Sequence, residues 1–153
     1  MAQDFKKLMA NVCSLINLDP ASAVIEGAPF YVNDVMFTLI FDEAVDARRI
    51  FLFARFGDLP PVNGGAVLAA LLRNNHLGFL GDGPGFSISP TTGKVTYCRH
   101  LFLEKTDARQ FADLLVYLAG KANEWRETFF LETAAAKAMP RHQPMLTAHR
   151  TLN

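Results

Sequence analysis

Two residues with chemically reactive side chains lie close together in the second half of the chain. Cys98 and His100 are two positions apart in a run typical of a β-strand, so both side chains are expected on the same face of that strand. A cysteine thiolate beside a histidine base is an arrangement used in nucleophilic catalysis. The sequence marks neither a carboxylate to orient the histidine nor donors for an oxyanion, and a buried cysteine usually serves as a small core residue. A catalytic pair at these positions is therefore the alternative hypothesis.

A glycine-rich stretch suggests a second kind of chemistry, the binding of a phosphate. Residues 76–86, HLGFLGDGPGF, contain four glycines and one proline. Such a loop binds phosphate through its backbone N–H groups when a strand precedes it and a helix follows it. Here a helical pattern precedes the loop, a strand pattern follows it, and no Gly-Lys-Ser/Thr motif is present. The segment Gly81–Gly85 is therefore expected to be a connector, and a ligand-binding domain that uses it belongs to the same alternative as Cys98 and His100.

Composition argues against several other classes of protein. The chain has 15 basic and 15 acidic residues, and this balance does not favour a nucleic-acid partner. Its two cysteines, Cys13 and Cys98, have no spacing typical of a metal site, so neither a metal nor another cofactor is expected. No apolar run approaches the roughly 20 residues that span a bilayer.

The N-terminal segment resembles a signal peptide, because two lysines precede an apolar run and an Ala-Ser-Ala sequence follows. Its apolar residues nevertheless recur at the spacing of an amphipathic helix. A helix that belongs to the folded domain is therefore predicted. The residues of its apolar stripe are Phe5, Leu8, Met9, Val12, Leu15 and Ile16.

The remaining patterns predict a single α+β domain with a mainly antiparallel sheet and the element order α-β-β-β-α-β-β-α. The domain is expected to cover residues 1–138, and residues 139–153 are expected to form a flexible tail. The last helix is predicted to begin near Asp107 with Thr106 as its N-cap. The other expected elements are a helix over about Asp4 to Leu18, strands over Phe30–Asn33, Val35–Asp42 and Arg49–Phe56, a helix carrying Val67 to Asn75, and a hairpin of Phe86–Ser89 with Lys94–Leu103.

Two of the predicted strands carry large apolar side chains on both faces. In Val35–Asp42, for example, Phe37 and Leu39 alternate with Met36 and Ile40. An antiparallel sheet with one face in water alternates apolar and polar residues instead. Either helices cover both faces of this sheet, or one face is left for a partner. The second helix is also more apolar than a short surface helix requires, which favours a two-fold dimer.

The order and spacing of several short motifs resemble those of the CesT-like type III secretion chaperones, the class I effector chaperones of bacteria. The resemblance covers about Asp4 to Leu131. The motifs that carry it are DFKKLMANVCSLINL, LIFDEAVD, FARFGDLP, LLRNNHLGFLGDGPGFSISPTTGKV and ANEWRETF.

The resemblance implies a cytoplasmic homodimer without enzymatic activity, cofactor, nucleic-acid partner or membrane insertion. Such chaperones hold the N-terminal segment of a secreted effector in extended form and keep it soluble for export, partly by adding a strand to the sheet. On the matching positions, the dimer interface is expected at Leu68, Leu71, Leu72, Asn75 and Leu77. The effector is expected at Met36, Thr38, Ile40, Phe51 and Phe53.

Overall fold

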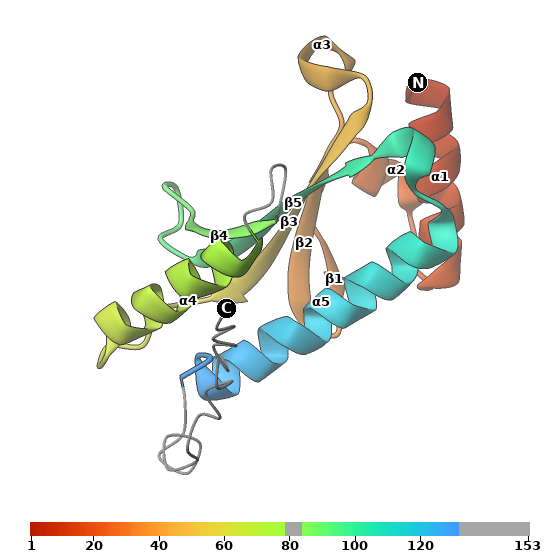
Figure 1. The fold of residues 1–153 in the computed structure, drawn as a ribbon. Coiled ribbons are helices and arrows are strands. Elements are labelled where there is room, and N and C mark those ends of the chain that lie inside the picture. The colour runs from red at the N-terminus through yellow and green to blue at the C-terminus, as the bar shows by residue number, and fades with distance from the viewer. Residues whose placement is uncertain (79–83, 132–153) are drawn as a thin grey trace, which may run out of the picture.

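The computed structural model describes residues 1–78, without the side chains of the last two, and residues 84–131 (Figure 1). Its centre is a five-stranded antiparallel sheet with the strand order β1-β2-β3-β5-β4. The predicted α+β class and the antiparallel sheet are confirmed. The strands are β1 (Phe30–Val32), β2 (Val35–Ile40), β3 (Arg49–Gly57), β4 (Gly85–Ile88) and β5 (Val95–Phe102).

The helices include the three that the sequence predicts and shorter ones that it did not. The predicted helices are α1 (Ala2–Leu15), α4 (Gly64–Gly78) and α5 (Ala108–Thr128). The unpredicted elements are α2 (Ala21–Ile25), α3 (Glu43–Asp46) and the 3-10 turn η1 (Leu103–Lys105). In the described part of the chain, no helix is long and apolar enough to cross a membrane. Most of the predicted connector Gly81–Gly85 and the whole predicted tail, 139–153, lie outside the described residues.

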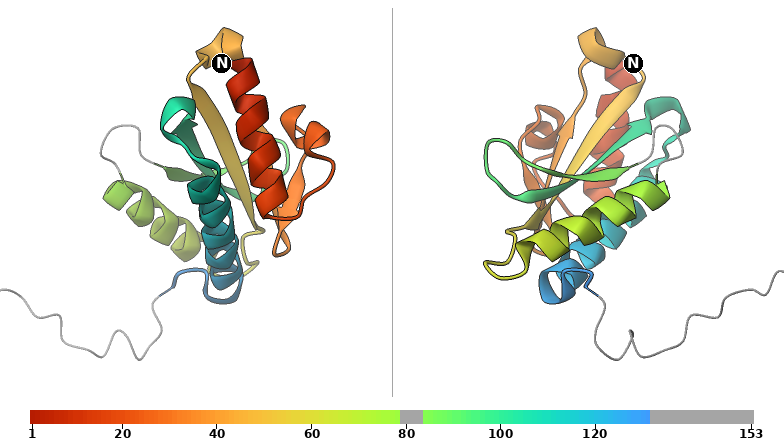
Figure 2. Two further views of the ribbon diagram at one scale, coloured as in Figure 1. Left: turned by 90° about the vertical axis from the view of Figure 1, so that its right-hand side faces the viewer. Right: turned by 60° about the vertical axis from the view of Figure 1, so that its left-hand side comes forward.

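Helices α1 and α5 cover one face of the sheet, as the left view of Figure 2 shows. The amphipathic stripe predicted for the N-terminal helix is confirmed in its first four members, which are buried. Burial of this apolar area is the main force that holds the helices to the sheet. From the sheet, the core takes Val35, Phe37 and Leu39 of β2 and Ile50, Leu52, Ala54 and Phe56 of β3, each at most 1% exposed.

Three predicted boundaries were wrong, and side-chain hydrogen bonds explain two of them. The β2 strand ends at Ile40 because Asp42 caps α3, where its Oδ1 accepts a hydrogen bond from Ala44 N at 2.8 Å. The N-cap of α5 is Asp107, whose Oδ1 accepts from Gln110 N at 2.9 Å. Thr106 is not the cap, because its hydroxyl donates to the carbonyl of Phe102. Helix α1 ends at Leu15, before Asn17, which adopts a left-handed φ of 54°.

The C-terminal turn of α5 is fastened to the sheet through Arg126. Its guanidinium reaches backbone carbonyls just before β2 and near the end of β3. Hydrogen bonds from a charged donor are stronger than neutral ones. They run from Nε to Phe56 O at 2.7 Å, from Nη1 to Asp34 O at 3.2 Å and from Nη2 to Arg55 O at 3.3 Å.

Helix α4 lies against β4 and protects the outer edge of the sheet there. The Asn75 amide binds both backbone groups of Phe86: its Nδ2 donates to the carbonyl at 3.0 Å, and its Oδ1 accepts from the N–H at 2.6 Å. An asparagine side chain thus takes the place of a further strand. This contact fixes α4 at the edge of the sheet and keeps it off the second face.

Replacing Asn75 by alanine is expected to destabilise the protein by about 2 kcal/mol, because it leaves two partly buried backbone groups of Phe86 without partners. Urea unfolding at a fixed protein concentration measures the loss. Asn74→Ala is the matched control, since its amide binds only the Ala70 carbonyl on its own helix at an exposed position, and its effect is expected within about 0.5 kcal/mol. Equal losses for the two variants would contradict this role of Asn75.

Candidate functional site

The second face of the sheet carries a continuous set of apolar side chains that no described helix covers. The strand register forms two rows across this face. One row consists of Thr38, Phe53 and Cys98, and the other of Ile40, Phe51 and His100. Paired residues lie on the same face. The residues of this face in β2 and β3 are partly exposed, and Ile40 reaches 47%. We call this surface, made of Met36, Thr38, Ile40, Phe51, Phe53, Arg55, Thr96, Cys98 and His100, the open face.

Two adjoining hollows lie over the open face. The larger, of about 480 Å³, has Met36, Ile40 and Phe53 as its apolar part, and the β4–β5 hairpin forms one wall. The smaller, of about 260 Å³, lies over Phe51 and shares Phe53 and Cys98 with the first. All five residues expected to bind an effector therefore line these hollows, although their binding role stays a prediction.

The walls of the larger hollow add polar groups that sequence reasoning missed. Besides Arg55, they carry the hydroxyl groups of Ser87, Ser89, Thr91, Thr92 and Thr96. None of the carboxylates that the structure describes lines either hollow. The alternation of residues in the predicted hairpin strands is the signal that could have pointed to Ser87 and Thr96. An apolar floor with hydroxyl groups around it suits an extended peptide, whose side chains need shallow pockets and whose backbone needs hydrogen bonds.

The residues of the alternative hypothesis also lie on the open face. Cys98 Sγ is 3.2 Å from the Ser87 hydroxyl, and the His100 ring packs edge-on against Phe102 at 5.7 Å between centroids. The other cysteine, Cys13, is buried, and burial raises the pKa of its thiol above the ordinary value, which disfavours the reactive thiolate. Within the described residues, no cluster of three or more His, Cys, Asp or Glu side chains is placed to hold a metal ion.

The residues expected at a dimer interface divide into two groups. Leu71 is 3% exposed within its own chain, and Asn75 is occupied by Phe86. Leu68 and Leu72, four positions apart on α4, are 37% and 67% exposed. Leu77 belongs to α4, but its side chain lies outside the described residues. An interface on this helix would therefore be centred on Leu68 and Leu72.

A sheet that is packed by helices on one face, and whose other face is apolar, hollowed and not covered by any described helix, is typical of a protein that presents a binding surface to a partner. Residues 7–126 match the sequence model of the Tir chaperone protein (CesT) family. The chain belongs to this family, and the resemblance to CesT-like type III secretion chaperones is confirmed. Among curated proteins, none is significantly similar to it in sequence.

Solved structures share this fold at low sequence identity. A chain of the ExsC–ExsE complex has a TM-score of 0.67 and 20% identity, over 84% of this chain and 96% of that one. A chain of the HopA1–SchA chaperone–effector complex has a TM-score of 0.61 and 18% identity, over 82% and 95%. The structure of the Yersinia pestis type III secretion chaperone SycH with a fragment of YscM2 contains a chain with a TM-score of 0.57 and 16% identity, over 78% and 98%.

Proposed function

We propose that this protein is a cytoplasmic bacterial chaperone that binds the N-terminal segment of a secreted effector in extended form and keeps it soluble for type III export. The observation that carries the proposal is the open face of a protein that belongs to the CesT family. Solved proteins of the same fold are named as a chaperone–effector complex and as a type III secretion chaperone bound to a fragment. We assign no catalytic step to the protein.

The physical properties of the open face fit such a client. Its floor offers apolar contact to alternate side chains of an extended segment, and the hairpin hydroxyls offer hydrogen bonds to its backbone. A segment that is disordered when free covers a large surface at modest affinity per unit area. The chaperone therefore holds its client unfolded without trapping it irreversibly.

The test uses the N-terminal segment of the protein encoded beside this one, because a dedicated chaperone is often encoded next to its effector. The purified chain and segment are mixed and analysed by gel filtration with light scattering and by limited proteolysis. The expected result is a stable complex in which the segment is protected from the protease yet shows no folded core of its own. The proposal would be overturned if neither this segment nor the N-terminal segment of any other protein encoded in the same cluster bound to the chain.

We also propose that the chain forms a two-fold dimer through the exposed leucines of α4. Leu72→Asp is expected to convert the dimer to a monomer of 16.9 kDa at micromolar concentration, because it places two carboxylates across an apolar two-fold contact. Sedimentation or light scattering measures the mass. Val116→Asp, which changes an apolar residue of α5 that is 48% exposed, is the control and should leave the dimer intact. A wild-type monomer at this concentration would contradict the dimer itself.

A further inference from the structure

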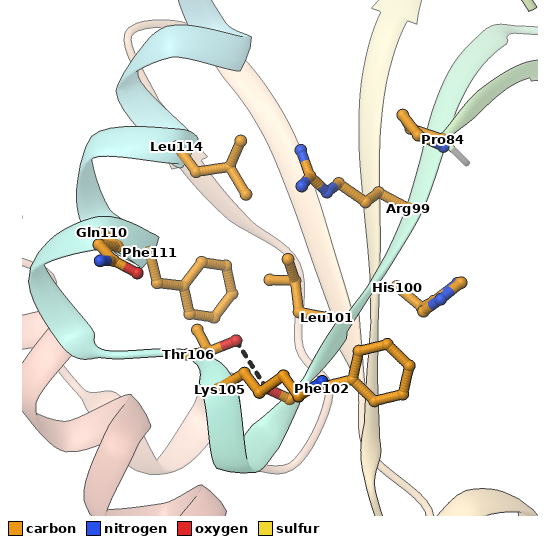
Figure 3. A pocket seen from close by; sticks show the side chains of 10 residues that line it. All are labelled: Pro84, Arg99, His100, Leu101, Phe102, Lys105, Thr106, Gln110, Phe111 and Leu114. Carbon is orange, nitrogen blue, oxygen red and sulfur yellow. Dashed lines mark hydrogen bonds between the residues drawn. The ribbon is translucent and has the colours of Figure 1, made fainter. Parts of the chain in front are cut away.

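A third hollow lies between β5 and the beginning of α5 (Figure 3), and it shares Arg99 and His100 with the smaller hollow of the open face. Its volume is about 480 Å³. Arg99 and Leu101 of β5 pair with Leu52 and Ile50 of β3, which point into the core, so these two side chains extend to the helix side, whereas His100 belongs to the open face. Leu101, Phe111 and Leu114 form its apolar floor. We call it the basic hollow, because Arg99 and Lys105 line it.

The charged groups of the basic hollow are all cationic. Arg99 and Lys105 approach the apolar floor from opposite ends (Figure 3), and no aspartate or glutamate among residues 1–76 and 84–131 lines the hollow. Within the described part of the chain, neither side chain forms an ion pair. Arg99 lies beside the Tyr97 phenol, whose pKa is raised by burial and lowered in part by this guanidinium. The ammonium of Lys105 lies 5.3 Å from the centre of the Phe102 ring. The two cations therefore have aromatic neighbours, and none of the described residues supplies a counter-charge to them.

We propose that the basic hollow binds an acidic side chain of the client segment together with an adjacent apolar side chain. This inference rests on the proposed chaperone function and adds a sequence preference to it. A carboxylate between Arg99 and Lys105 gains charge-assisted hydrogen bonds, and a neighbouring leucine or phenylalanine side chain covers Leu101 and Phe111. A free inorganic anion would leave the apolar floor uncovered. A second copy of this chain would bring further cations to the hollow, which disfavours it as the occupant.

A client that lies on the open face reaches this hollow along β5, where Arg99 and His100 line both hollows, and it then contacts side chains from both faces of that strand. Extended, disordered segments can do so because they wrap around a folded partner. The open face recognises apolar side chains in general, whereas the basic hollow adds a charge requirement. The requirement narrows the set of clients, because specificity arises from groups that penalise the wrong partner as well as from those that attract the right one.

The experiment selects peptides from a phage-displayed library of random 16-residue sequences on the full chain. The wild type is expected to enrich peptides that carry Asp or Glu beside Leu, Ile or Phe. The charge-reversed variant Arg99→Glu/Lys105→Glu is expected to enrich Lys or Arg at that place, a gain that misfolding cannot imitate. Arg109→Glu is the matched control, since Arg109 lies outside the hollow and is paired with Asp113 on the surface of α5. It should keep the wild-type preference.

A second measurement uses one acidic peptide from the wild-type selection. Its affinity is expected to fall about tenfold or more for Arg99→Gln/Lys105→Gln and to stay unchanged for Arg109→Gln. An unchanged affinity for the first variant, or an acidic preference that survives charge reversal, would overturn the inference. A change of oligomeric mass with charge reversal, without a change in peptide preference, would also overturn it and assign the hollow to a second copy. If the wild type selected no peptides at all, the proposed chaperone function would fail as well.

Discussion

Phe53→Asp is expected to abolish client binding and leave the fold intact, whereas Ala54→Asp is expected to unfold the protein. The two residues are neighbours in β3 and point to opposite faces. Phe53 lines both hollows of the open face and is partly exposed, so a carboxylate there stays in contact with water. Ala54 is 0% exposed, and an unpaired charge buried at its position costs several kcal/mol. That cost is comparable with the total stability of a domain, about 5–15 kcal/mol.

Circular dichroism on heating measures the fold of both variants, and gel filtration with the client segment measures binding. Val116→Asp is the control for added charge, because Val116 is 48% exposed on α5, on the helix side of the sheet, and outside the hollows; it should neither unfold the protein nor prevent binding. Two results would contradict the assignment of the open face. Full client binding by a folded Phe53→Asp protein would place the client elsewhere, and unfolding of that variant would show that another element buries Phe53.

The parts of the fold that repeat a simple period were predictable from sequence. The stripe from Phe111 to Trp125 has helical spacing and is buried as α5, and the alternation in β2 and β3 divides their residues between two faces as the strand period requires. The five residues expected to contact an effector do lie on one face for this reason. Both faces are apolar in sequence, however, so the pattern could not decide which of them the helices cover.

That decision depends on long-range contacts, among them the packing of α5 on the sheet and the position of α4. The Asn75 amide binds the backbone of Phe86 and holds α4 at the β4 edge, and an asparagine in a helical pattern carries no sign of such a partner. The short helix α3 and the cap of α5 were missed for a related reason. Asp42 and Asp107 each accept a local hydrogen bond that begins a helix, but an aspartate at such a position is equally common in turns and at strand ends, so its type alone does not predict the helix. The basic hollow was also missed, because β5 and η1 supply its cations while α5 supplies part of its floor.

Trp125→Ala is expected to destabilise the protein by about 3–5 kcal/mol, the range found for loss of a buried aromatic side chain. Trp125 is 0% exposed. Its ring lies 5.9 Å from that of Phe56 and 5.1 Å from that of Phe129, measured between centroids. Gly57 also faces the indole ring, and it has no side chain that could refill the space. A cavity should therefore remain, and the melting temperature is expected to fall by about 10 °C or more.

Urea and thermal unfolding at one fixed protein concentration measure this loss, since the stability of a dimer depends on concentration. Tyr117→Ala is the matched control: Tyr117 lies on the same helix but is 60% exposed, so its loss should change the stability by less than about 1 kcal/mol. Trp125 is followed by Arg126, which binds the carbonyls of Phe56 and Arg55. Loss of the Trp125 side chain is therefore expected to loosen the end of β3, where Arg55 lines the larger hollow. Client affinity should accordingly fall even where the variant is still folded. Normal stability with normal client affinity would contradict the view that this aromatic cluster supports the open face from behind.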